Sequence, residues 1–182
     1  MDRRTRRSRK AIFDAFEQLL SEKSYGSITA SEIIERADIG RTTFYAHFET
    51  KDALLTELCR DLFAHVLKPS DVAEKSHAFD DAASLDESLA HILYHLKDQH
   101  ARLKSLLEGP SCHLFWQAFE GELATFFSSR TARDRGLPGE IPHDLQVRFL
   151  TATFAEACRW WFAHDVQCAP EKVVSYFNQL VG

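Results

Sequence analysis

Residues 28–55 constrain the fold of this chain more than any other stretch of its sequence. The stretch opens on Thr29 with Glu32 three residues later, the pattern of a capping box, in which both side chains satisfy backbone N–H groups at the start of a helix. Asp38 and Gly40 belong to the turn that follows, because aspartate tolerates left-handed backbone and glycine is free in φ. Apolar residues recur at helical spacing on both sides of this turn. The stretch therefore predicts two short helices joined by a tight turn and followed by a third helix.

The second of these helices, expected over residues 41–48, has two unlike faces. Phe44 and Phe48 lie one turn apart and form an apolar face that suits a core. The other face carries arginine, threonine and tyrosine side chains, which can hydrogen-bond to base edges and to phosphates. A helix that presents such side chains from its first turns can enter the major groove of DNA. We therefore predict a helix-turn-helix, with DNA contacts at Thr29, Ser31, Arg41, Thr42, Thr43, Tyr45, His47 and Lys51.

Positive charge gathers at the N-terminal end of the chain. The net charge is -5, but residues 1–68 hold 12 Lys and Arg against 11 Asp and Glu, whereas the remaining residues hold 10 against 16. Six of the first ten residues are basic. A basic segment beside a helix-turn-helix fits a local DNA footprint, and a solvated basic tail is the alternative.

The rest of the chain reads as helices separated by short breaks, without the alternation of a β-strand. Gly26 is expected in the left-handed conformation that ends the first helix. Further helices are predicted over residues 7–23, from the capping box of Ser84 and Glu87, over residues 112–130, over residues 145–164, and from Pro170 onward.

These elements predict an all-α fold with two domains. The polar segment 70–83 has no periodicity and is the best candidate for a domain boundary. We expect an N-terminal three-helix helix-turn-helix DNA-binding domain in residues 1–66, with its motif at residues 29–48. A C-terminal helical bundle for dimerisation and ligand binding is expected in residues 67–182.

The stretch 28–55 also resembles the DNA-binding signature of TetR-type (TetR/AcrR) transcriptional regulators. The resemblance rests on the hydroxyl cap at Thr29, the run Thr43-Phe44-Tyr45-x-His47-Phe48, and Lys51-Asp52-x-Leu54. It implies that Arg41, Thr42, Thr43 and Tyr45 face the groove and that His47 and Lys51 contact the DNA backbone.

Two positions depart from the pattern of this family. Members often have glycine where this chain has Asp38, and serine or threonine where it has Gly40. A glycine is a weaker cap than a hydroxyl side chain, so the recognition helix is expected to begin more loosely.

The resemblance also implies an assembly and a mode of action. Such regulators dimerise through their last two long helices, which would explain why residues 145–164 are apolar nearly all round. The expected protein is a homodimeric repressor that binds a palindromic operator in double-stranded DNA and is released by a small-molecule effector. A monomeric bundle whose core absorbs both helices is the alternative.

The predicted C-terminal bundle is rich in aromatic residues, as ligand pockets often are. An ordinary core would have the same composition. Contacts to the effector are predicted at His91, Tyr94, His95, Trp116, Phe119, Phe149 and Trp160.

Neither a metal nor another cofactor is expected. His91 and His95 have a spacing that could hold a metal, but two histidines on a solvated helix explain it as well. The four cysteines form no CxxC pair and are expected to be small buried hydrophobes rather than disulfides, metal ligands or redox sensors.

Several classes of protein are not indicated. The sequence contains no G-x-S-x-G, P-loop, dinucleotide or H-E-x-x-H motif, so no enzyme is predicted. No apolar run reaches the roughly 18 residues of a membrane span, and the N-terminus lacks the apolar segment of a secretion signal, so a cytoplasmic protein without membrane contact is expected. The remaining alternative is a helical protein-interaction module with no specific DNA binding.

Overall fold

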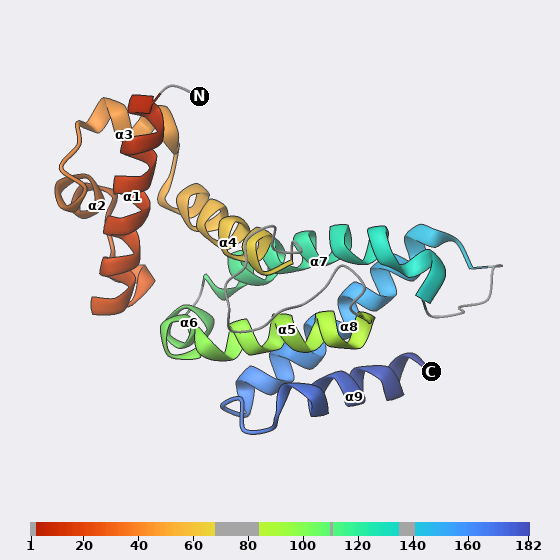
Figure 1. Ribbon diagram of the computed structural model, residues 1–182. Coiled ribbons are helices and arrows are strands. Elements are labelled where there is room, and N and C mark those ends of the chain that lie inside the picture. Colours follow the sequence, from red (N-terminus) through yellow and green to blue (C-terminus); the bar gives the residue numbers. More distant parts are fainter. Residues whose placement is uncertain (1–2, 68–83, 110, 135–140) are drawn as a thin grey trace. The chain divides into compact units, whose positions relative to one another are not determined.

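The computed structural model describes residues 3–67, 84–109, 111–134 and 141–182 (Figure 1). Within these ranges the secondary structure is helical and contains no strand, which confirms the predicted all-α fold. The predicted boundary segment 70–83 lies outside the described residues, so the domain boundary after residue 66 remains a prediction.

The chain forms two compact units. The first contains residues 1–59 and 101–115, and the second contains residues 60–100 and 116–182. Helices α4 (Lys51–Leu67) and α7 (Cys112–Asp134) therefore each begin in the first unit and end in the second.

The first unit holds the predicted helix-turn-helix. Its elements are α1 (Arg3–Glu22), the 3-10 turn η1 (Tyr25–Ser27), α2 (Ala30–Arg36), α3 (Arg41–His47), the start of α4 and most of α6 (His100–Leu107). Helix α1 packs against α2 and α3, and its apolar stripe is buried. The core of the first unit includes Ile12, Phe16, Leu19, Ile33, Phe44, Phe48, Leu54 and Leu55.

The second unit is built around α5 (Leu85–Asp98), α8 (His143–Ala163) and α9 (Pro170–Val181). Helix α9 packs against both α5 and α8 (Figure 1). Phe127, Phe154 and Phe177 are buried against one another, with ring centroids 5.3–6.3 Å apart. Pro170 occupies the first turn of α9 as predicted, where its missing N–H has no intrahelical partner to lose.

One local prediction was wrong. Gly26 does not adopt left-handed backbone. Instead, Ser24, which follows α1, has an extended backbone. The 3-10 turn η1 then closes through a hydrogen bond from the Ser27 amide to the Ser24 carbonyl. The helix that opens at Ser84 ends at Asp98, and a separate short helix, α6, begins at His100.

Candidate nucleic-acid interface

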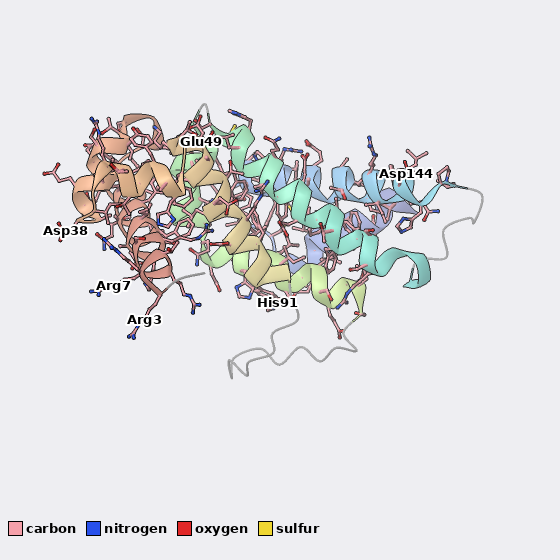
Figure 2. All side chains as sticks on the ribbon, turned by 90° about the horizontal axis from the view of Figure 1, so that it is seen from above. Arg3, Arg7, Asp38, Glu49, His91 and Asp144 are labelled. Carbon is pink, nitrogen blue, oxygen red and sulfur yellow. The ribbon has the colours of Figure 1, made fainter. Side chains whose placement is uncertain are left out.

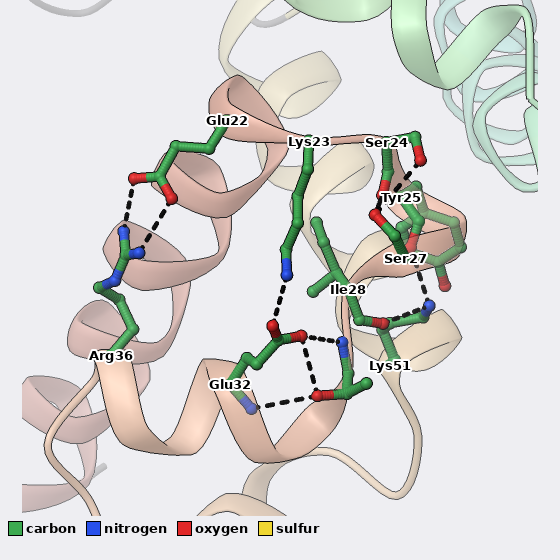
Figure 3. A network of polar contacts seen from close by, with 10 residues as sticks. Glu22, Lys23, Ser24, Tyr25, Ser27, Ile28, Glu32, Arg36 and Lys51 are labelled. Atoms are coloured by element: carbon green, nitrogen blue, oxygen red, sulfur yellow. Dashed lines mark hydrogen bonds and ion pairs between the residues drawn. The ribbon is translucent and has the colours of Figure 1, made fainter.

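The start of α2 is fixed by the capping box that the sequence predicts (Figure 3). The Thr29 hydroxyl accepts a hydrogen bond from the Glu32 amide at 3.3 Å, and the Glu32 carboxylate accepts one from the Thr29 amide at 2.8 Å. Lys23 also donates to Glu32. These contacts, with the Lys23 hydrogen bond foremost, lower the pKa of Glu32 to about 2, so the cap stays ionised at neutral pH.

The turn between α2 and α3 uses its two unusual residues differently. Asp38 adopts left-handed backbone with φ 51°, as predicted. Gly40 is the N-cap of α3, but its φ of -72° and ψ of 149° are extended backbone that any residue can adopt. No side chain caps α3 at this position. The conformational freedom of glycine is therefore not needed at residue 40.

Helix α3 has a buried apolar face and an exposed polar face. Phe44 is buried within the helix and Phe48 is buried just after it. Arg41 and Thr42 are exposed, and so is Tyr45, whose side chain is 48% exposed. The Arg41 guanidinium donates to the Ser31 hydroxyl at 3.1 Å, which joins the first turn of α3 to α2. The structure therefore brings these predicted contact residues together on one accessible surface, with Thr43 half-buried beside them.

His47 already has a partner inside the first unit. Its Nε2 atom lies 2.8 Å from the hydroxyl oxygen of Ser8, which ties the end of α3 to α1. Sequence reasoning missed Ser8. The available signal was its position four residues before Ile12, on the buried stripe of α1.

Lys51 is also engaged within the protein (Figure 3). Its ammonium donates to the carbonyl oxygens of Tyr25 at 2.9 Å and Ile28 at 2.8 Å, and it lies 4.1 Å from the centre of the Tyr25 ring. The Tyr25 hydroxyl in turn donates to Asp52. Burial, followed by this hydrogen bond, raises the pKa of Tyr25, so the hydroxyl remains a donor.

The structure separates the basic residues at the start of the chain into two groups. Arg9 pairs with Glu57 at 3.0 Å, and Lys10 pairs with Asp14 at 2.7 Å. Four arginines on the first two turns of α1 are exposed, and no ion pair or hydrogen bond to their side chains is found among the residues that the structure describes. Two of these, Arg3 and Arg7, extend outward in Figure 2. The other two are Arg4 and Arg6.

The residues predicted to bind an effector lie on different parts of the second unit. On α5, His91 and His95 contact each other through their Nε2 atoms at 3.1 Å, while the Tyr94 hydroxyl donates to Glu171 of α9 at 2.6 Å. This bond raises the pKa of Tyr94 and lowers that of Glu171.

The other four residues of that predicted set divide between two further helices. On α7, Phe119 is buried and its ring contacts that of Trp116 at 5.9 Å. On α8, Phe149 and Trp160 are 49% and 43% exposed. Trp160 lines a surface hollow of about 610 Å³ between α8 and α9, whose lining includes none of the other six.

The cysteines and histidines add no second site. All four cysteines are free, with Cys59 and Cys158 buried as predicted and Cys112 and Cys168 only partly buried. Burial raises the pKa of the Cys59 thiol to about 12 and also raises that of Cys158, so the arginine after each does not activate it. Within the described ranges, no group of three or more metal-ligating side chains could hold a metal ion. In the same ranges, no helix is both long and apolar enough to span a membrane.

A capped α2, a tight turn and an α3 with an exposed polar face, all packed on α1, define a helix-turn-helix protein. Residues 12–58 match the model of the family described as bacterial regulatory proteins, tetR family. A TetR transcriptional regulator from Streptococcus agalactiae, known from its crystal structure, is 32% identical with a TM-score of 0.72, over 99% of this chain and 96% of that one. This chain belongs to the TetR family.

Other relatives agree with this assignment. An uncharacterised HTH-type transcriptional regulator of Bacillus subtilis, YxbF, is 35% identical over 80 residues, which are 43% of this chain and 21% of that protein. The dhaKLM operon transcriptional activator DhaS of Lactococcus lactis is 33% identical over 60 residues, which are 33% of this chain and 32% of DhaS. The matched segment thus spans about a fifth to a third of these relatives. A solved structure of the dihydroxyacetone kinase operon activator DhaS, 20% identical with a TM-score of 0.61 over 95% of this chain and 93% of that one, shares the fold.

Proposed function

We propose that this protein is a sequence-specific DNA-binding transcriptional regulator that reads DNA with α3. The observation that carries the proposal is the division of α3 into a buried phenylalanine face and an exposed face with Arg41, Thr42 and Tyr45. Arg41 suits recognition of guanine O6 and N7, and Thr42 and Thr43 suit either a hydrogen bond or the methyl group of thymine. Tyr45 has the reach to contact a neighbouring phosphate.

Contacts to the DNA backbone would supply most of the affinity. We assign these contacts to Thr29, Ser31 and His47, and to the four exposed arginines at the start of α1. The hydrogen bond between His47 and Ser8 places the end of α3 beside this part of α1. Because Arg4 is one turn before Ser8, it lies on the side of α1 that meets α3. Each phosphate contact releases counterions, so the affinity should fall steeply with salt.

We further propose that the protein acts as a homodimer through α8 and α9. Apolar side chains on these helices remain exposed in the single chain. Leu180 is 66% exposed, and Phe149 and Trp160 are 49% and 43% exposed. Leu145, Phe149 and Trp160 recur on one face of α8, and Trp160 and Leu180 line the hollow between α8 and α9. A large exposed apolar patch of this kind fits a protein interface. A two-fold dimer would present two copies of α3 to a palindromic operator, about one DNA turn apart.

The regulation proposed is repression that a small-molecule effector releases. The second unit supplies aromatic surface for such a ligand at Trp116, where Phe119 and Phe162 contact the indole and the Arg159 guanidinium lies 4.8 Å from its ring centre. Apolar or aromatic compounds are therefore the first effectors to screen. The relative DhaS is named as an activator, so a reporter gene downstream of the operator should establish the sign of regulation.

Selection from a random pool of DNA duplexes tests the proposal. The purified protein is mixed with the pool at about physiological salt, and the retained DNA is sequenced over several rounds. We expect enrichment of a palindromic site. If the folded protein enriches no sequence, the specific-regulator proposal fails and the helical protein-interaction module becomes the better account.

A further inference from the structure

The peptide group between Ile28 and Thr29 is held at both of its polar atoms. Its carbonyl oxygen accepts from the Lys51 ammonium at 2.8 Å, and its amide donates to the Glu32 carboxylate at 2.8 Å. Both contacts are drawn in Figure 3. This peptide immediately precedes the first turn of α2. The ammonium of Lys51 therefore fixes the point from which α2 starts.

Contacts then lead from this peptide to the side chain proposed to read bases. Ser31 lies two residues after Thr29 in the first turn of α2, and its hydroxyl accepts from the Arg41 guanidinium at 3.1 Å. A displacement of the start of α2 would therefore move Ser31 and disturb the orientation of Arg41.

Lys51 belongs to the first turn of α4, which is anchored to η1 at more than one point. Thr50 caps α4 by accepting from the Ala53 amide at 3.0 Å, and Asp52, which follows Lys51, accepts from the Tyr25 hydroxyl. The Lys51 ammonium also donates to the Tyr25 carbonyl and lies against the Tyr25 ring. Two of the three N–H donors of this half-buried ammonium are thus used, and its positive charge faces an aromatic ring.

We propose that Lys51 is a positioning residue for the DNA interface, which holds the start of α2 through the Ile28–Thr29 peptide rather than binding phosphate. This inference rests on the proposed DNA-binding function. It gives Lys51 a role different from the phosphate contact that the family resemblance implies. Among the residues that the structure describes, the exposed arginines of α1 have no such internal partners, so their donors are available for phosphate.

Lys51→Met tests this role, because methionine keeps the apolar stem and removes the ammonium. Lys10→Met is the matched control, since among the described residues Lys10 pairs only with Asp14, on the surface of α1. For each protein, the affinity for the selected operator is measured over a series of salt concentrations. Hydrogen exchange of the backbone amides at the start of α2 is measured without DNA. Thermal unfolding sets a temperature at which every variant is folded, and Lys51→Gln replaces Lys51→Met if methionine prevents folding.

A positioning residue and a phosphate ligand give different results. We expect Lys51→Met to weaken operator binding about tenfold, the equivalent of one charge-assisted hydrogen bond, and to leave the slope of log K against log salt unchanged. The amides at the start of α2 should exchange faster in Lys51→Met and not in Lys10→Met. If removal of Lys51 made the negative slope less steep by about 0.9, Lys51 would be a phosphate contact and the inference would be overturned. An unchanged affinity of the folded variant would also overturn it, because the role would then be structural only.

Failure of the proposed function would look different. In that case the wild-type protein itself would show no preference for any operator, whatever the variants do. The hydrogen-exchange measurement would still test whether Lys51 holds the start of α2. Unchanged exchange of these amides in Lys51→Met would refute that role without reference to DNA.

Discussion

Replacement of Gly40 by serine should stabilise the protein, because the backbone conformation of residue 40 does not require glycine. Its φ of -72° and ψ of 149° are ordinary extended backbone, and an added Cβ would meet its nearest neighbour, the Thr43 hydroxyl oxygen, at 3.8 Å. Residue 40 is the N-cap of α3, and no side chain caps that helix there. A serine hydroxyl at this position can accept from the free Thr43 amide in the first turn.

Two contributions set the size of the effect. Serine exceeds glycine as an N-cap by a few tenths of a kcal/mol. Loss of the glycine from the unfolded chain adds about 0.4–1 kcal/mol. The expected gain in the free energy of unfolding is therefore about 1 kcal/mol, which corresponds to a rise of about 2–4 °C in Tm for a chain of this size.

Gly40→Ala separates these contributions. Alanine restricts the unfolded chain in the same way but is a much poorer N-cap than glycine, so its net effect should be close to zero. Thermal unfolding followed by circular dichroism compares the three proteins. If Gly40→Ser is no more stable than the wild type, or if Gly40→Ala stabilises as much, the capping argument is refuted.

Three further predictions follow from individual contacts. Glu32→Gln keeps a capping side chain but removes its charge. Because the folded pKa of Glu32 is about 2, below its usual value, the wild type should exceed this variant in stability above about pH 5 and lose that advantage as the pH falls toward 2 in acid-unfolding measurements. Leu180→Arg should give a folded monomer by light scattering where the wild type is a dimer, since Leu180 is 66% exposed in the single chain, and a monomeric wild type would contradict the dimer proposal. Cys59 and Cys158 should react with a thiol reagent only on unfolding, while the other two cysteines react in the native protein.

The parts of the fold that depend on neighbouring residues were accessible from the sequence. The capping box of Thr29 and Glu32 and that of Ser84 and Glu87 both form as predicted, because each involves residues three positions apart. The left-handed Asp38 and the helix start at Pro170 are local in the same sense.

Contacts between distant segments were not accessible in this way. The bond between His47 and Ser8 joins residues 39 positions apart, and no local pattern indicates that the ammonium of Lys51 finds the Ile28 carbonyl. The division at Gln99 was also missed, since no glycine or proline marks it.

Aromatic composition was the least informative signal in the second unit. Phe119 and Phe149 have the same side chain, yet the first is buried and the second is about half exposed. A ligand pocket, a core and a dimer surface all use such residues, so the sequence alone could not separate them. The exposed face of α8 is our proposed dimer interface, and Trp116 is our proposed contact for an effector.

Arg41 lies on the exposed face of α3 that is proposed to read DNA sequence, so its replacement shows whether this face sets the base preference. The measurement is the ratio of affinities for the selected operator and for a scrambled duplex of equal length, at one salt concentration. The wild type is compared with Arg41→Ala and with Lys97→Ala, which removes an exposed positive charge from α5, outside the proposed DNA and dimer surfaces. We predict that Arg41→Ala lowers the ratio by about tenfold or more and relaxes the base preference at one position of each half-site, while Lys97→Ala leaves the ratio unchanged. An Arg41→Ala protein that keeps the wild-type ratio would contradict the account.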